Sequence, residues 1–337
     1  MISERPFVAE PYPGIFRITM PIPFPGLDHV HVYAGEGESG GLVVIDTSLG
    51  WDDSLARLEE GLATMGRRTA DIERVVLTHA HPDHVGLARV LQEASGAPVA
   101  CHPIARTGFE GMQTPDRWQE ITDHYSEHGR DPEDTRRHFM HLPLPDVFED
   151  LEAGAVLRFA GGDWDVSWTP GHEHGHIAFH RRSDGLLMSG DTLLPSITPH
   201  VGYLIDPPDP LGMFMRSLDD LAALQPSIVL PGHGRVFTNG AERARATRSH
   251  HEQRLRRIIE VLARLGPLSA MDVSRQLFGR HLKFFQGRLA LAETLAHLEH
   301  LRLGGQLSRE KLDGVWRYEA TRSATISPSR VGTTVDR

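Results

Sequence analysis

The sequence predicts an α/β protein that carries a helical insertion and ends in a separate unit of three helices and a β-hairpin. Three observations predict this. Over residues 1–240, several short β-branched and aliphatic runs are expected to be strands. Several of the short runs end in Gly, His or Asp, as strands do where their carboxyl ends line a crevice. Beyond residue 240, apolar residues recur at helical spacing.

The first polar cluster follows the run Val75–Leu77, which is too short and too β-branched for a helix and is expected to be a buried strand. The loop after it carries His79, His81, Asp83 and His84. Three crowded imidazoles and a carboxylate compete for protons at neutral pH, whereas a divalent cation accepts a lone pair from each. The bland alternative is a loop of solvated polar residues, and the ligands that follow argue against it.

Three later strand ends supply further candidate ligands. Each short apolar run is followed by a turn and one metal-binding side chain, which is His172, Asp191 or His233. Each signal is weak alone, because Gly-His and Gly-Asp are common in turns. A tetrahedral site needs about four ligands, so seven indicate two metal ions about 3.5–4 Å apart that share one bridging carboxylate. The seven are His79, His81, Asp83, His84, His172, Asp191 and His233.

This ligand set resembles that of the metallo-β-lactamase superfamily of hydrolases, over residues from about 15 to about 240. The match is the His-x-His-x-Asp-His motif at 79–84, followed in the family's order by His172, Asp191 and His233. The resemblance implies an αββα sandwich with the site at one edge. It also implies one metal held by His79, His81 and His172, a second held by Asp83, His84 and His233, and Asp191 bridging both.

The bridging aspartate points to particular branches of that superfamily. In true class B β-lactamases the position matching Asp191 is usually not a bridging aspartate, so the chain looks more like the glyoxalase II, lactonase and lactamase-β-like ribonuclease branches. The diiron oxygen reductases carry Glu where this chain has His81, and they add a flavodoxin domain that this sequence lacks. Asp46, after the run Leu42–Ile45, also fits the family and is expected to accept the N–H of a ligating imidazole. The alternative is that Asp46 caps the turn before Trp51.

An insertion at residues 103–150 lies between the first cluster and Trp168. Its prolines mark breaks between predicted helices, and its aromatic residues have two interpretations. They form the insertion's own small core, or they form a helical cap that supplies an apolar pocket for a small organic substrate. The candidate pocket residues are Trp118, Phe139, His200 and Tyr203, of which His200 or Tyr203 would donate to a developing oxyanion.

Residues 241–320 are expected to form a winged-helix-like domain. Helices are predicted at 242–265, from the N-cap Ser269 to Leu277, and at 286–301, with a hairpin around Asp313–Gly314. Lactamase-β-like endoribonucleases carry such a unit. Leucines crowd the third helix and few basic residues remain on it, which favours a structural role or a homodimer over nucleic-acid binding. Residues 321–337 are Ser/Thr-rich and are expected to be a disordered tail.

The composition indicates the cellular compartment and the kinds of partner that are expected. The chain has 337 residues and one cysteine, Cys101, which excludes an internal disulfide and fits the cytoplasm. No membrane-spanning run or signal peptide is expected, and the Pro-rich first 14 residues are expected to be irregular. The net charge of −10 divides into −18 for residues 1–240, +6 for residues 241–320 and +2 for the tail. The acidic catalytic part argues against a polyanionic substrate.

These features predict a dinuclear metal-dependent hydrolase that acts on an ester, thioester or lactone through a metal-bound hydroxide. Asp83 would orient the water or carry its proton to the leaving group. Zinc suits the ligand set best, and iron or manganese would also suit it. The alternatives are an endoribonuclease or phosphodiesterase and, with less support, a mono-iron sulfur dioxygenase. A non-catalytic protein that kept the fold is disfavoured, because all seven ligands are present.

Overall fold

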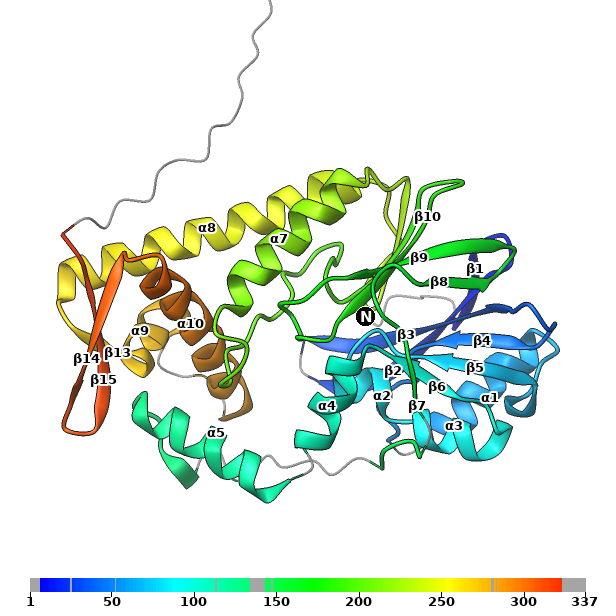
Figure 1. Cartoon of the computed structure of the whole chain (residues 1–337), viewed down its shortest axis with the longest axis horizontal. Coiled ribbons are helices and arrows are strands. Elements are labelled where there is room, and N and C mark those ends of the chain that lie inside the picture. The colour runs from blue at the N-terminus through cyan, green and yellow to red at the C-terminus, as the bar shows by residue number, and fades with distance from the viewer. Residues whose placement is uncertain are drawn as a thin grey trace, which may run out of the picture.

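This computed structural model of the chain describes residues 7–24, 26–51, 53–112, 114–133, 143–146, 148–279, 282 and 284–322. Two β-sheets pack face to face between two layers of helices, and a smaller C-terminal unit lies beside them (Figure 1). None of the described helices is long and apolar enough to cross a membrane. The α/β sandwich expected from the sequence is therefore confirmed.

The first sheet has seven strands in sequence order, antiparallel from β1 to β4 and parallel from β4 to β7. The expectation that residues 1–14 are irregular is wrong for β1, whose edge position tolerates Pro11. The strands are β1 (Val8–Tyr12), β2 (Ile15–Phe24), β3 (Leu27–Glu36), β4 (Leu42–Ile45), β5 (Ile72–Val76), β6 (Val99–Cys101) and β7 (Phe148–Asp150).

The second sheet has the order β12-β11-β10-β9-β8, in which only β11 and β12 are parallel. Buried residues of the two sheets, including Val76, Trp164 and Leu230, form the core between them. The strands are β8 (Val156–Phe159), β9 (Gly162–Trp168), β10 (Ile177–Arg181), β11 (Leu186–Gly190) and β12 (Ile228–Pro231).

Helices cover the outer face of each sheet (Figure 1). Leu58, Leu62 and Leu91 pack on the first sheet, and Phe214 and Leu218 pack on the second. These helices are α1 (Ser54–Thr64) and α3 (Ala88–Ser95) on the first sheet, and α7 (Pro210–Ala223) on the second. The short elements η1 (Thr69–Asp71) and α2 (Pro82–Val85) lie in the connections before and after β5.

The C-terminal unit has the three helices and the hairpin that the sequence predicts. Ser269 accepts a hydrogen bond from the N–H of Asp272 and so caps the second helix. A two-residue strand joins the hairpin, so the sheet order is β13-β15-β14. The elements are α8 (Gly240–Leu265), β13 (Leu268–Ser269), α9 (Ala270–Phe278), α10 (Phe284–Leu303), β14 (Leu307–Leu312) and β15 (Val315–Ala320).

The insertion contains α4 (Pro103–Met112) and α5 (Pro115–Glu127). The aromatic residues of the insertion that the structure describes do not form one core of their own. Phe109 stacks on Phe148 beneath the first sheet, whereas Tyr125 packs with the helices of the C-terminal unit. The Glu127 carboxylate accepts hydrogen bonds from Lys311 at 2.7 Å and Trp316 at 3.2 Å. Helix α5 is therefore attached to the C-terminal hairpin, along the lower left of Figure 1.

Candidate metal centre

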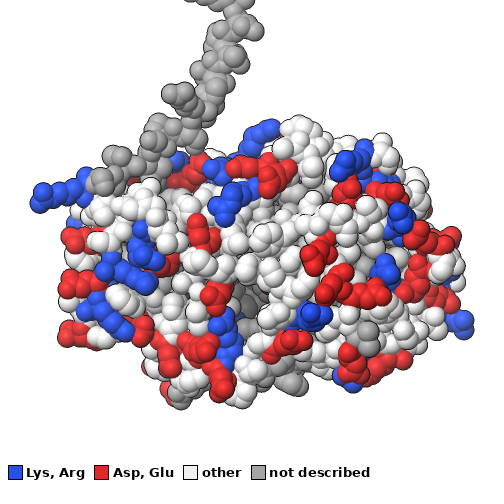
Figure 2. All heavy atoms as spheres, viewed as in Figure 1, with Lys and Arg blue, Asp and Glu red and all other residues white. Residues whose placement is uncertain are grey.

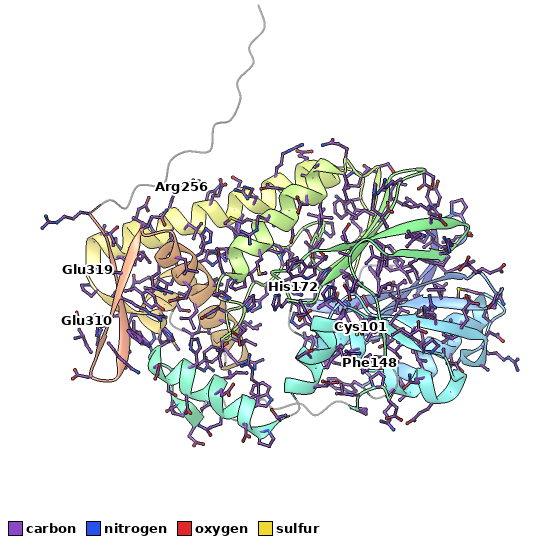
Figure 3. The ribbon with its side chains drawn as sticks, in the orientation of Figure 1. Cys101, Phe148, His172, Arg256, Glu310 and Glu319 are labelled. Atoms are coloured by element: carbon purple, nitrogen blue, oxygen red, sulfur yellow. The ribbon has the colours of Figure 1, made fainter. Side chains whose placement is uncertain are left out.

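All seven predicted ligands lie at one edge of the sandwich. His79, His81, Asp83 and His84 follow β5, and Pro82 begins the short helix α2, which turns Asp83 and His84 inward. The other three follow β9, β11 and β12, as the sequence predicts. In Figure 3, His172 lies where the green second sheet meets the C-terminal helices.

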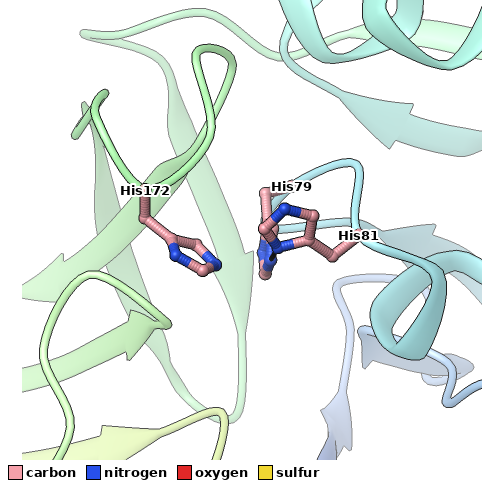
Figure 4. A group of neighbouring side chains, drawn as sticks. All are labelled: His79, His81 and His172. Carbon is pink, nitrogen blue, oxygen red and sulfur yellow. Dashed lines mark hydrogen bonds between the residues drawn. The ribbon is translucent and has the colours of Figure 1, made fainter. Parts of the chain in front are cut away.

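The first triad consists of His79, His81 and His172, whose rings converge from two loops (Figure 4). The Nε2 atom of His79 lies 2.9 Å from Nδ1 of His81. Nδ1 of His172 donates to the carbonyl of His200 at 2.6 Å, which leaves Nε2 for another partner. That Nε2 is buried and has no hydrogen-bond partner among the residues that the structure describes. Burial lowers the pKa of His81 and of His172 to about 3, so both rings are neutral and carry a free lone pair.

The second triad consists of Asp83, His84 and His233. Nε2 of His233 lies 3.4 Å from Oδ2 of Asp83 and 3.3 Å from Nε2 of His84. Nδ1 of His233 donates to the carbonyl of His29 at 2.6 Å. Nε2 of His233 therefore faces the same space as the carboxylate of Asp83 and Nε2 of His84.

Asp191 lies between the two triads. Its Oδ2 is 3.1 Å from Nε2 of His233 and 3.6 Å from Nε2 of His172, and its Oδ1 is 3.6 Å from Nε2 of His84. Oδ1 is buried, and no described residue forms a hydrogen bond with it. A buried polar atom without a partner costs about 1–3 kcal/mol, and a divalent cation removes that cost. The donor set therefore suits metal ions, and Asp191 stands where a bridging ligand would.

Asp46 has the position that the family resemblance implies. Its Oδ2 accepts from Nδ1 of His84 at 2.8 Å, and its Oδ1 accepts from the N–H of Thr78 at 2.8 Å. The Thr78 hydroxyl also donates to Asp46 and lies 2.9 Å from Nδ1 of His79. Asp46 thus orients a ligand in each triad, directly for His84 and through Thr78 for His79. Burial disfavours a charged His84, but the carboxylates of Asp46, Asp191 and Asp83 outweigh that effect and raise the pKa of the ring.

Sequence reasoning missed three histidines that support the ligands. Nε2 of His176 accepts from the N–H of Asp191 at 3.0 Å, which places its proton on Nδ1, beside the hydroxyl of Thr169. Nε2 of His29 accepts from the N–H of Gly234 at 2.8 Å, and Nε2 of His31 donates to the Gly234 carbonyl at 2.6 Å. His29 and His31 lie two residues apart and therefore on one face of β3, and this alternation is the signal that the sequence offers for the pair.

Glycine precedes Asp191 for a steric reason. Gly190 has φ +47°, and a Cβ built on it would lie 2.5 Å from Nε2 of His176. Any side chain there would displace the ring that holds the backbone of Asp191.

Of the four predicted pocket residues, Trp118, His200 and Tyr203 contact the C-terminal unit. Trp118 on α5 and Tyr203 pack against the C-terminal core, and Tyr203 makes an edge contact with His124, with ring centroids 5.4 Å apart. Nε2 of His200 is 3.0 Å from the Leu289 carbonyl, so its N–H is directed at α10. Phe139 lies outside the described residues. Figure 2 shows a hollow at the centre of the viewed face, between the catalytic part and the C-terminal unit.

Comparisons with known proteins agree with this geometry. Residues 25–233 match the family model described as the metallo-beta-lactamase superfamily, and residues 255–321 match the one described as the metallo-beta-lactamase-like C-terminal domain. The sandwich and its ligand set thus define a metal-dependent hydrolase. The chain belongs to the metallo-beta-lactamase superfamily.

Individual relatives match over most of the chain. A probable metallo-hydrolase of Bacillus subtilis, YqjP, is 28% identical and covers 85% of this chain and 92% of its own. The crystal structure of a metallo-beta-lactamase family protein from Thermus thermophilus, TTHA1429, is 34% identical with a TM-score of 0.81, over 92% of this chain and 99% of the other. An atrochrysone carboxyl ACP thioesterase of Paecilomyces divaricatus, AgnL7, is 26% identical over 58% of this chain and 48% of its own.

Proposed function

We propose that this hydrolase acts on an acyl ester, thioester or lactone and uses two divalent metal ions, with zinc as the best match to the ligands. The observation that carries the proposal is Asp191, whose two oxygens face ligands of both triads. The thioesterase among the relatives supports acyl chemistry. The proposed substrate is a small acyl compound.

The bound metal ions would supply a water of lowered pKa and polarise the acyl oxygen. The chain's own residues do the rest. His79, His81 and His172 would hold one ion, Asp83, His84 and His233 the other, and Asp191 both. Asp46, His29 and His176 hold the ligands in place through hydrogen bonds to side chain or backbone.

Asp83 is the proposed proton carrier. It lies at the start of α2, and its Oδ2 is 3.4 Å from Nε2 of His233 and 3.8 Å from Nε2 of His84. In this proposal its carboxylate orients the attacking water and passes the proton of that water to the departing oxygen or sulfur. Trp118 and Tyr203, on the C-terminal side of the site, would hold the acyl group.

Hydrolysis of RNA is the second candidate, and the C-terminal unit is the observation that favours it. Several of its arginines, however, are engaged with carboxylates. Arg248 pairs with Asp219 at 2.9 Å, and Arg302 and Arg309 each lie 2.8 Å from Glu299. A mono-iron sulfur dioxygenase is a third alternative, which the two triads disfavour.

Metal analysis and a substrate panel test the proposal. Protein stripped with a chelator and reloaded should saturate at two ions per chain, and zinc should restore the most activity. The loaded enzyme should then cleave thioesters, esters or lactones faster than phosphodiesters or RNA. Saturation at one ion per chain would contradict the dinuclear centre, and a preference for RNA would favour the ribonuclease.

A further inference from the structure

Glu173 follows the ligand His172, and its carboxylate contacts the backbone of both loops that carry the first triad. One carboxylate oxygen, Oε2, accepts from the N–H of Gly175 at 2.9 Å. The N–H groups of Ala80 and His174 also donate to this carboxylate. Ala80 lies between His79 and His81, so one side chain joins the His79–His81 loop to the loop of His172.

The backbone and surroundings of Glu173 fix it in place. Its carbonyl accepts from the N–H groups of Gly171 at 3.2 Å and His176 at 3.4 Å. Helix α4 lies against this segment: a Cβ built on Gly175 would lie 2.2 Å from the nitrogen of Ala105, and one built on Gly108 would lie 3.7 Å from Oε1 of Glu173. The carboxylate is thus held by peptide N–H groups, whose hydrogen bonds favour its charged form.

We infer that Glu173 is a positioning residue for the ion held by His79, His81 and His172, an inference that rests on the proposed metal centre. By holding the Ala80 peptide against the loop of His172, the carboxylate brings the rings of His81 and His172 to 4.5 Å between centroids. The second triad is supported by other groups, Asp46 on His84 and the His29 carbonyl on His233. Loss of Glu173 should therefore weaken one ion and spare the other.

The test is Glu173→Gln, which keeps the shape of the side chain but turns an amide NH₂ toward backbone donors. Metal-free protein is titrated with Zn²⁺ against a chromophoric chelator that resolves two binding steps. We expect one step to weaken by about 10–100-fold and the other to remain unchanged. Hydrogen exchange of the peptide around Ala80 should also become faster in the metal-free variant. Glu60→Gln, at an exposed position of α1, is the matched control and should change neither readout.

Three other outcomes are decisive. Two unchanged binding steps would overturn the inference. Equal weakening of both steps, with a lower melting temperature of the metal-free variant, would also overturn it, since it would show a general structural role. If the wild-type protein binds only one ion, the dinuclear proposal fails by itself. The Glu173 inference is then judged on that ion: weaker binding in the variant supports it, and unchanged binding refutes it.

Discussion

At the scale of single residues, Asp191 has contacts that none of the individual histidine ligands should be able to replace. Its oxygens lie 3.1–3.6 Å from His84, His172 and His233. Asp191→Ala should therefore reduce metal content from two ions toward none, whereas His81→Ala should remove mainly one. Elemental analysis of dialysed protein measures this. Equal loss in the two variants would show that Asp191 does not bridge.

Asp46 permits a conservative test of ligand orientation. Asp46 has φ +63°, a backbone conformation that asparagine also tolerates, so Asp46→Asn should fold. The amide cannot accept from Nδ1 of His84 and from Thr78 as the carboxylate does. We expect kcat/KM or metal affinity to fall by about 10–100-fold. Asp163→Asn, at an exposed position of β9, is the control. If both variants retain wild-type activity, Asp46 only shapes its turn.

The ligands could be predicted from the sequence, but most of their supports could not. Each ligand follows a short apolar run, so local sequence marks it. The residues that hold the ligands in place are distant from them in the sequence. His31 donates to the carbonyl of Gly234, 203 residues away, and His176 accepts from the N–H of Asp191, 15 residues away. Glu173 acts through peptide N–H groups, which every residue has and which no motif reveals.

At the scale of elements, a buried histidine pair joins α8 to α10. Nδ1 of His251 lies 3.1 Å from Nε2 of His297, whose Nδ1 donates to the Glu293 carbonyl. Burial lowers the pKa of His251 to about 3 and that of His297 well below its usual value, and Arg254 opposes protonation of both. Above pH 6.5 neither the folded nor the unfolded chain protonates them. Below pH 6.5 only the unfolded chain takes up protons at these two histidines. The free energy of unfolding therefore decreases as the pH is lowered.

This predicts how a variant should respond to acid. His251→Gln removes one titrating group. The difference in free energy of unfolding between the wild type and the variant should therefore change by about 2 kcal/mol, to the disadvantage of the wild type, between pH 6.5 and pH 5. Urea unfolding of chelator-treated protein at both pH values measures the difference without a contribution from the metal centre. A difference that stays constant with pH would contradict this, since it would show that folding does not lower the pKa of His251.

Helix α5 offers a test of the pocket. Trp118 lies on the side of α5 that meets the C-terminal core, with Arg288 6.0 Å from its ring centroid. Trp118→Ala should raise KM for an apolar acyl substrate several-fold and leave metal content unchanged. Unchanged kinetics with a lower melting temperature would instead assign Trp118 to packing alone.

The elements were predicted better than their packing. Ser269, Gly266 and Asp313–Gly314 mark helix and hairpin ends locally, and the structure has those ends. What α5 would contact was not predictable, because its apolar face suits any core. The leucines of α10 raised the prospect of a dimer, but Leu291 and Leu295 pack within the chain. A homodimer remains a proposal without a surface assigned to it.

At the scale of the whole molecule, the C-terminal unit shares a core with the catalytic part. Phe214 and Leu218 of α7 pack in one cluster with Ile258 and Leu295. Arg243 of α8 also donates to the carbonyls of Leu194 and Ile197, at 2.7 Å each, just after Asp191. Removal of the C-terminal unit would expose Phe214 and Leu218, and each large apolar side chain left exposed lowers the free energy of unfolding by about 1.5–3 kcal/mol.

Truncation near Arg243 should therefore lower the melting temperature or produce aggregates without changing substrate preference. Thermal unfolding and light scattering of the truncated chain measure this. A stable monomer with altered substrate choice would contradict it and assign recognition to the C-terminal unit.

Charge distribution decides between acyl substrates and RNA. On the face shown in Figure 2, Lys and Arg are intermixed with Asp and Glu, and residues 1–240 carry a net charge of −18. Each phosphate contact releases counterions, so true RNA binding would weaken steeply as salt rises. We expect weak RNA binding and a kcat/KM for a neutral ester that changes little between 50 and 200 mM salt, a range over which several phosphate contacts cost about 10³-fold or more. The charge-reversed variant Arg245→Glu with Arg264→Glu, at exposed positions of α8, should behave like the wild type. Tight RNA binding that this variant loses would make the ribonuclease the better assignment, because it would show that these two arginines contact the phosphate backbone.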